Sequence, residues 1–168
     1  IKYLDLAIGC LEPTAPRLIV IGGLSGTGKT SLARALAPTI LPLPGALILR
    51  SDVIRKHLAE IGQYETLPDE GYSAEMTQKT YRQIYRDAAT ALAAGHSVIA
   101  DAVFAGPEER AAIAEVAKHA GIAFDGIWLD LDPAAAEARI SNRTKDASGA
   151  TVAILKQQLA SDVGRIDW

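Results

Sequence analysis

The sequence predicts an α/β fold of three layers, with a doubly wound parallel sheet of four to five strands and helices on both of its faces. Two observations carry this prediction. Short apolar runs alternate with longer stretches of helical periodicity, a pattern typical of parallel strands joined by right-handed crossovers. The chain has 168 residues, of which 49% are hydrophobic and 22% are charged, which is enough for one domain with a sizeable core.

The strands are predicted from short apolar runs bounded by turn-forming residues. They cover residues 17–21, 46–50, 97–101 and 127–129 with its neighbours, and residues 166–168 could begin a fifth. The helices are predicted from apolar stripes and from residues that favour helix ends, such as Ser51, Pro107 and Asp132 at starts and Gly121 at an end. They run from a glycine-rich loop to about 37, from 52, from about 73 to 94, from 107 to about 120, from 133 to about 142, and from 151 to about 163.

We divide the chain into an N-terminal segment or linker, residues 1–16, and one domain, residues 17–168. The first segment holds a short apolar stretch followed by two prolines, which is typical of a connection. The chain begins at Ile1 and stops where a fifth strand would begin. We therefore expect a fragment of a longer protein, truncated at the C-terminus, with a covalently linked N-terminal domain as a candidate partner.

Composition disfavours several classes of partner. The net charge is −3 with no long basic run, which disfavours a nucleic-acid partner without excluding one. No apolar run reaches the roughly 20 residues of a membrane span, and the start does not resemble a signal peptide. Cys10 is the single cysteine, interpreted as a small apolar filler in a reducing, cytoplasmic setting.

A glycine-rich motif joins the first strand to the first helix. Residues 23–30, GLSGTGKT, fit G-x-x-x-x-G-K-[ST], the phosphate-binding P-loop. Its backbone N–H groups and the helix N-terminus form an anion site, the lysine reaches the β- and γ-phosphates, and the last hydroxyl can bind Mg²⁺. The expected nucleotide-binding residues are Gly23, Leu24, Ser25, Gly26, Thr27, Gly28, Lys29, Thr30 and Ser31.

Two carboxylates follow the next two predicted strands. Asp52 lies just after the second strand, in the element Ser51-Asp52-x-x-Arg55, and Asp101 ends the third. The carboxyl ends of parallel strands share one edge of a doubly wound sheet, where ligands bind. We therefore expect Lys29, Asp52 and Asp101 to converge there.

These motifs resemble those of the P-loop small-molecule kinases, the group that includes gluconate kinase, chloramphenicol phosphotransferase, zeta toxin and the polynucleotide kinase domain. Four segments, GGLSGTGKTSLARALAP, LRSDVIRK, AGHSVIADAVFAGPEER and QLASDVGRIDW, are similar to predicted kinases with a P-loop domain. In some of those chains this domain follows an aminoglycoside-phosphotransferase-like domain. The resemblance covers nearly the whole chain and implies ATP and Mg²⁺ as cofactors, with an unidentified small molecule as acceptor.

The resemblance implies roles for the residues beside the P-loop. Asp52 would accept or orient the substrate hydroxyl proton, or would be only an N-terminal helix residue. Arg55 would hold an anionic substrate group, or would pair with Asp52 one turn away. Asp101 would hold Mg²⁺ or bind substrate, or would be a solvated carboxylate in a turn.

Two arginines, Arg139 and Arg143, lie one helical turn apart before a polar stretch at residues 144–149. By the resemblance this stretch is a lid whose arginines close on the phosphates, with Arg139 binding nucleotide and Arg143 acting in catalysis beside Lys29 and Asp52. The alternative is a basic last turn that is stabilised by the helix dipole.

Three functions compete. The first is an ATP-dependent kinase that phosphorylates a hydroxyl of a small molecule. The second is a switch or motor ATPase without an acceptor, and the third is a regulatory nucleotide-binding domain of a larger protein. The chain lacks the Asn-Lys-x-Asp motif of GTPases and the Leu-Ser-Gly-Gly-Gln signature of transporter ATPases, and these absences favour the kinase.

Overall fold

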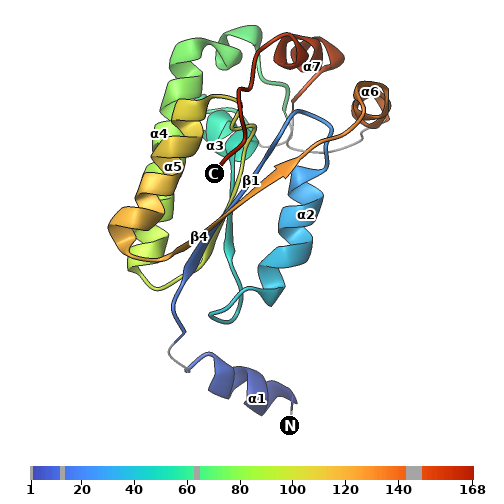
Figure 1. Ribbon diagram of the computed structural model, residues 1–168. Helices are drawn as coiled ribbons and strands as arrows, with labels where there is room; N and C mark the ends of the chain where they lie inside the picture. Colours follow the sequence, from blue (N-terminus) through green and yellow to red (C-terminus); the bar gives the residue numbers. More distant parts are fainter. Residues whose placement is uncertain (1, 12–13, 63–64, 143–148) are drawn as a thin grey trace.

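The computed structural model describes residues 2–11, 14–62, 65–142 and 149–168, with the backbone alone at residues 69 and 70. A parallel sheet forms the middle layer of the domain (Figure 1). Its strands are β1 (Arg17–Gly23), β2 (Leu47–Arg50), β3 (Val98–Asp101) and β4 (Ala123–Leu129), in the order β2-β3-β1-β4. The predicted doubly wound parallel sheet is therefore confirmed.

Alternation along the central strand β1 sends side chains to opposite faces of the sheet. Leu18 and Val20 belong to the core cluster on the face covered by α4 (Ala74–Ala93) and α5 (Pro107–Ala120). Ile19 and Ile21 belong to the cluster on the face covered by α2 (Lys29–Leu36). Figure 1 shows these helices on the two sides of the sheet, which confirms the three layers.

Four elements lie at the end of the sheet where its strands end. They are the helices α3 (Ser51–Leu58), α6 (Pro133–Ser141) and α7 (Val152–Leu159), and the short 3₁₀ turn η2 (Asp69–Tyr72). A second 3₁₀ turn, η1 (Ala37–Thr39), follows α2 and precedes β2. The third core cluster joins the two last helices through Ala136, Ile140 and Leu155. The edge of the sheet where its strands end is thus enclosed by elements distant in sequence.

Capping residues explain several helix boundaries. The Asp132 carboxylate accepts hydrogen bonds from the N–H groups of Ala134 and Ala135 at 3.0 and 3.1 Å, as predicted. Gly121 ends α5 with φ +67°, a left-handed conformation that favours glycine. Ser51 was predicted as the cap of α3, but the helix begins at Ser51 itself, because β2 runs directly into it with Arg50 as the extended flanking residue.

The C-terminal tail does not form a fifth strand within the described residues. The last helix ends at Leu159 rather than near residue 163. Beyond it, Arg110 binds the carbonyl oxygens of Val163 and Arg165, so these groups are not available to a strand ladder. Trp168 instead packs edge-on against Phe104, with ring centroids 5.8 Å apart.

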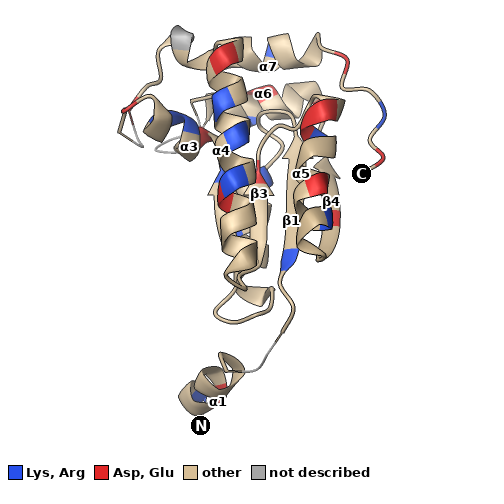
Figure 2. Ribbon diagram, turned by 90° about the vertical axis from the view of Figure 1, so that its left-hand side faces the viewer, with Lys and Arg blue, Asp and Glu red and all other residues tan. Residues whose placement is uncertain are grey.

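The N-terminal segment forms a helix, α1 (Lys2–Gly9), which lies away from the sheet (Figures 1 and 2). None of its residues is buried. Cys10 is exposed, so its interpretation as a core filler is wrong, because this segment does not enter the core. Among the described residues, no helix combines the length and the apolarity needed to cross a membrane.

Candidate nucleotide and acceptor site

A cleft of about 860 Å³ lies at the carboxyl edge of the sheet. Its walls come from the P-loop, the start of α3, the end of β3, the middle of α4 and the helices α6 and α7. Parallel strand pairing explains why these parts meet, since Asp101 is in register with Ile21 on one side and with Arg50 on the other. The predicted convergence of Lys29, Asp52 and Asp101 on one cleft is therefore observed.

The P-loop backbone needs glycine at its turns. Gly26 has φ +85°, and a Cβ atom at this position would lie 2.8 Å from the carbonyl oxygen of Ala136 in α6. Gly28 flanks the start of α2 with φ +99°, a conformation rarely adopted by other residues. The loop therefore turns its backbone toward the positive end of a helix, as an anion site requires.

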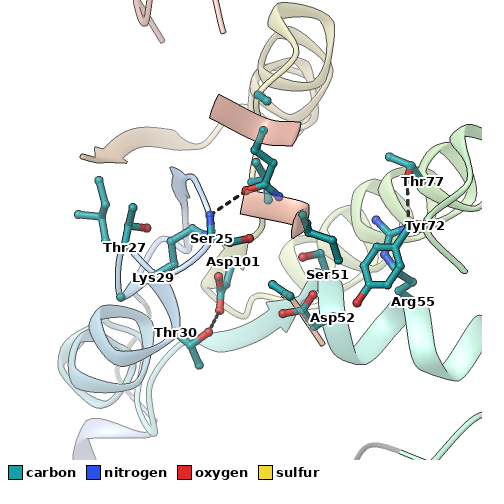
Figure 3. Close-up of a pocket in the computed structure, with 18 of the residues that line it drawn as sticks. Ser25, Thr27, Lys29, Thr30, Ser51, Asp52, Arg55, Tyr72, Thr77 and Asp101 are labelled. Carbon is teal, nitrogen blue, oxygen red and sulfur yellow. Dashed lines mark hydrogen bonds between the residues drawn. The ribbon is translucent and has the colours of Figure 1, made fainter. Parts of the chain in front are cut away.

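The P-loop lysine points back over the beginning of the loop. Lys29 Nζ donates to the carbonyl oxygens of Gly23 at 2.7 Å and Leu24 at 2.9 Å. Figure 3 shows its side chain beside Ser25 and Asp101. The ammonium group is thus held at the first two residues of the loop.

The two predicted metal ligands touch each other. Thr30 Oγ1 donates to Asp101 Oδ2 at 2.6 Å (Figure 3). Asp101 is 4% exposed, and burial raises its pKa, opposed by the Thr30 hydrogen bond and by the charges of Lys29 and Arg50. Arg50 Nε lies 3.7 Å from the same carboxylate oxygen. The carboxylate is therefore a buried, fixed group and not a solvated turn residue.

Asp52 and Arg55 lie on the first two turns of α3 (Figure 3). Both line the cleft. The Arg55 guanidinium donates to Gly71 O at 3.0 Å and to Thr77 Oγ1 at 3.1 Å, and it lies 5.5 Å from the centre of the Tyr72 ring. Arg55 therefore joins η2 and α4 to the site, while its substrate role stays a prediction.

The other side of the P-loop is contacted by the last two helices. Arg139 Nη1 donates to Thr27 O at 3.3 Å, so this predicted nucleotide residue does lie at the loop. Arg143, predicted to be catalytic, lies outside the described residues. Gln158 of α7 accepts a hydrogen bond from Ser25 N at 2.9 Å. The two residues are 133 positions apart, so no local sequence pattern predicts this contact.

Two further residues line the cleft outside the predicted set of site residues. Tyr81 is 7% exposed, and its hydroxyl accepts from Phe104 N at 2.9 Å. Glu109 accepts from Gly106 N at 3.1 Å and lines the same cleft. Burial raises the pKa of both groups.

The fold and the cleft define the class of protein: this is a P-loop kinase-like α/β domain. The chain belongs to the AAA domain family, whose model matches residues 18–162. It is also 34% identical over 115 residues to the uncharacterised proteins Rv2004c of Mycobacterium tuberculosis and Mb2027c of Mycobacterium bovis. That match covers 66% of this chain but 22% of each relative, so the chain spans about a fifth of the length of these curated relatives.

Solved structures of kinases share the fold. The APS kinase CysC of Mycobacterium tuberculosis, in complex with AMPPNP and APS, is 26% identical with a TM-score of 0.62, over 77% of this chain and 71% of that one. A sugar kinase from Janibacter has 22% identity and a TM-score of 0.62, over 90% of this chain and 80% of that one. A gluconokinase from Sinorhizobium meliloti has 22% identity and a TM-score of 0.56, over 86% and 74%. The predicted resemblance to P-loop small-molecule kinases is thus confirmed.

Proposed function

We propose that this domain binds ATP with Mg²⁺ and transfers the γ-phosphate to a hydroxyl group of a small molecule. The observation that carries the proposal is the cleft that brings Lys29, Thr30 and Asp101 together with Asp52. A phosphate cradle with an adjacent carboxylate is the arrangement that in-line transfer to a hydroxyl requires. The kinases among the structural neighbours agree with this proposal.

The donor half of the reaction depends on the P-loop. Its N–H groups and Lys29 would hold the phosphates, with Lys29 exchanging its carbonyl contacts for phosphate oxygens. The Thr30 hydroxyl and the Asp101 carboxylate, 2.6 Å apart, fit Mg²⁺, which prefers oxygen ligands and keeps several waters. The chemistry that bound Mg²⁺ supplies is neutralisation of charge on the β- and γ-phosphates.

The acceptor half depends on Asp52. Its carboxylate, at the start of α3 and facing the cleft, would accept a hydrogen bond from the substrate hydroxyl and take its proton as the phosphoryl group moves. Because phosphoryl transfer passes through a loose transition state, orientation of the hydroxyl contributes more than basicity. Arg139, already bonded to the loop at Thr27 O, would add positive charge on the opposite side.

The test is ATP consumption with Mg²⁺ against a library of sugars, antibiotics, nucleosides and oligonucleotides. We expect one class of small molecule to stimulate turnover, and Asp52→Asn to reduce that stimulated rate by about 100-fold or more. Asp5→Asn, which changes an exposed carboxylate on α1, is the matched control and should have the same stimulated rate as the unmodified protein. Lys29→Ala should abolish tight nucleotide binding.

The alternative function is a P-loop ATPase or a regulatory nucleotide-binding domain in a longer protein. The matched relatives are much longer than this chain, which supports a domain that works as part of a larger protein. It predicts turnover, or binding without turnover, that is indifferent to every acceptor and to Asp52. That result would reject the kinase proposal, and unchanged nucleotide binding by Lys29→Ala would reject the site itself.

A further inference from the structure

A hydrogen bond joins the P-loop to α7: Ser25 N donates to Gln158 Oε1 at 2.9 Å (dashed line at Ser25 in Figure 3). The two segments also share apolar contacts. Leu24 packs against the cluster formed by Ala136, Ile140 and Leu155, and Leu155 is 1% exposed. The helix is therefore anchored one turn before Gln158, and the position of this side chain at the loop is fixed by the fold.

Gln158 contacts the part of the loop that Lys29 also reaches. Lys29 Nζ is bonded to Gly23 O and Leu24 O, the two residues that precede Ser25. A P-loop lysine binds the β- and γ-phosphates, so under the proposed function these phosphates would lie within reach of its ammonium group. Gln158 also lines the cleft that contains Asp52 and Asp101.

A carboxamide can accept and donate at the same time. With Oε1 occupied by Ser25 N–H, the Gln158 Nε2 group retains two N–H donors within about 2.3 Å of that oxygen. A neutral amide in this position can donate to an anion without adding a charge of its own. The same side chain can therefore keep its bond to the loop and bind a phosphate oxygen beside it.

We propose that Gln158 is a further phosphate-binding residue, which donates from Nε2 to an oxygen of the γ-phosphoryl group while Oε1 stays on Ser25 N. The proposal rests on the proposed function, because it takes the P-loop as a triphosphate site. It assigns to α7 a role in distinguishing a triphosphate from a diphosphate. A simple tether between α7 and the loop is the competing role.

The test compares the binding of AMPPNP and of ADP by calorimetric titration, each with Mg²⁺. Gln158→Ala should weaken AMPPNP binding about tenfold, since a hydrogen bond to a charged group is lost, and should change ADP binding by less than about twofold. Gln158→Glu should weaken AMPPNP binding at least as much. Its carboxylate can still accept from Ser25 N, but it offers no donor and repels the γ-phosphate. Gln78→Ala, an exposed glutamine on α4 that does not line the cleft, is the control and should bind both nucleotides as the unmodified protein does.

Two results would overturn the proposal. If Gln158→Glu binds AMPPNP as the unmodified protein does, or if Gln158→Ala weakens both nucleotides equally, the side chain is a tether only. Because Gln158→Glu is nearly isosteric, it decides the question even if Gln158→Ala does not fold. No acceptor is needed, so a failed search for a substrate rejects the kinase proposal and leaves this one standing. Failure of the unmodified protein to bind either nucleotide would reject both.

Discussion

Removing the buried guanidinium of Arg110 should destabilise the domain and release its C-terminal tail. Arg110 is 4% exposed. Its Nη1 donates to Phe104 O at 2.9 Å and to Ala105 O at 2.8 Å, and its Nη2 donates to Val163 O at 2.9 Å and to Arg165 O at 3.0 Å. One side chain thus ties the loop after β3, which contributes to the cleft, to the tail after α7.

The size of the effect follows from these four bonds. A hydrogen bond from a charged donor contributes about 1.5–3 kcal/mol. The two tail carbonyls can regain water once the tail leaves, whereas the two loop carbonyls stay inside. Counting the loop pair alone, Arg110→Met should cost about 3–6 kcal/mol in the free energy of unfolding. Phe104, at φ +50°, adds to this cost, because a bulky residue holds that conformation only when its neighbours fix it.

Urea unfolding followed by circular dichroism measures the loss, with Arg82→Met as the control. Arg82 is exposed on α4 and bonds only weakly to Gln78, at 3.3 Å, so its replacement should change stability by less than about 0.5 kcal/mol. Trypsin should also cleave faster after Arg165 in Arg110→Met, since the tail is no longer held. A loss below about 1 kcal/mol with unchanged cleavage would refute this account of Arg110.

Two further variants test the P-loop and the wall of the cleft that contains Glu109. Gly26→Ala should lower both stability and nucleotide affinity more than Gly95→Ala. The two glycines have φ +85° and +86°, but only a Cβ at position 26 would lie within 2.8 Å of a backbone oxygen. Equal stability losses in urea unfolding would show that the close contact at position 26 is relieved. Glu109→Gln should raise stability at pH 7 and lose that advantage in acid. Burial raises the pKa of Glu109, so its protonated form favours the fold at low pH, and this contribution is lost as the pH rises through the folded pKa. Urea midpoints between pH 4 and 7 check this, with the exposed Glu108→Gln as control, and a less stable Glu109→Gln at pH 7 would contradict it.

The donor half of the cleft could be predicted from the sequence because each of its parts has a local signal. The P-loop is a contiguous motif, and Asp101 ends an apolar run that parallel pairing brings to the same edge. The cap at Asp132 follows in the same way from a short-range hydrogen bond. Ser51 was misjudged for a tertiary reason. Its strand continues directly into the helix, so its hydroxyl faces the cleft and does not cap α3.

The contacts that could not be predicted join residues far apart in the sequence. Gln158 meets Ser25 because Leu155 anchors α7 on α6, and Arg110 meets the tail because its helix begins beside the same end of the sheet. Neither position carries a motif. The tail was expected to add a strand, since Ile166 and Trp168 suit one, but Trp168 packs against Phe104 and Phe124. Side-chain packing on the sheet face prevails there over strand propensity.

The two halves of the cleft are built differently, and this difference bears on how the function can change. The donor half rests on backbone groups of the P-loop and on one pair of touching side chains, Thr30 and Asp101. These groups tolerate little substitution, because the loop backbone needs glycine at its turns and the two side chains need their hydrogen bond. The acceptor half is assembled from single side chains on different helices, with Asp52 and Arg55 on α3 and Tyr81 on α4. Under the proposed function, a substitution on those helices can alter which hydroxyl compound is bound while the phosphate donor site stays intact.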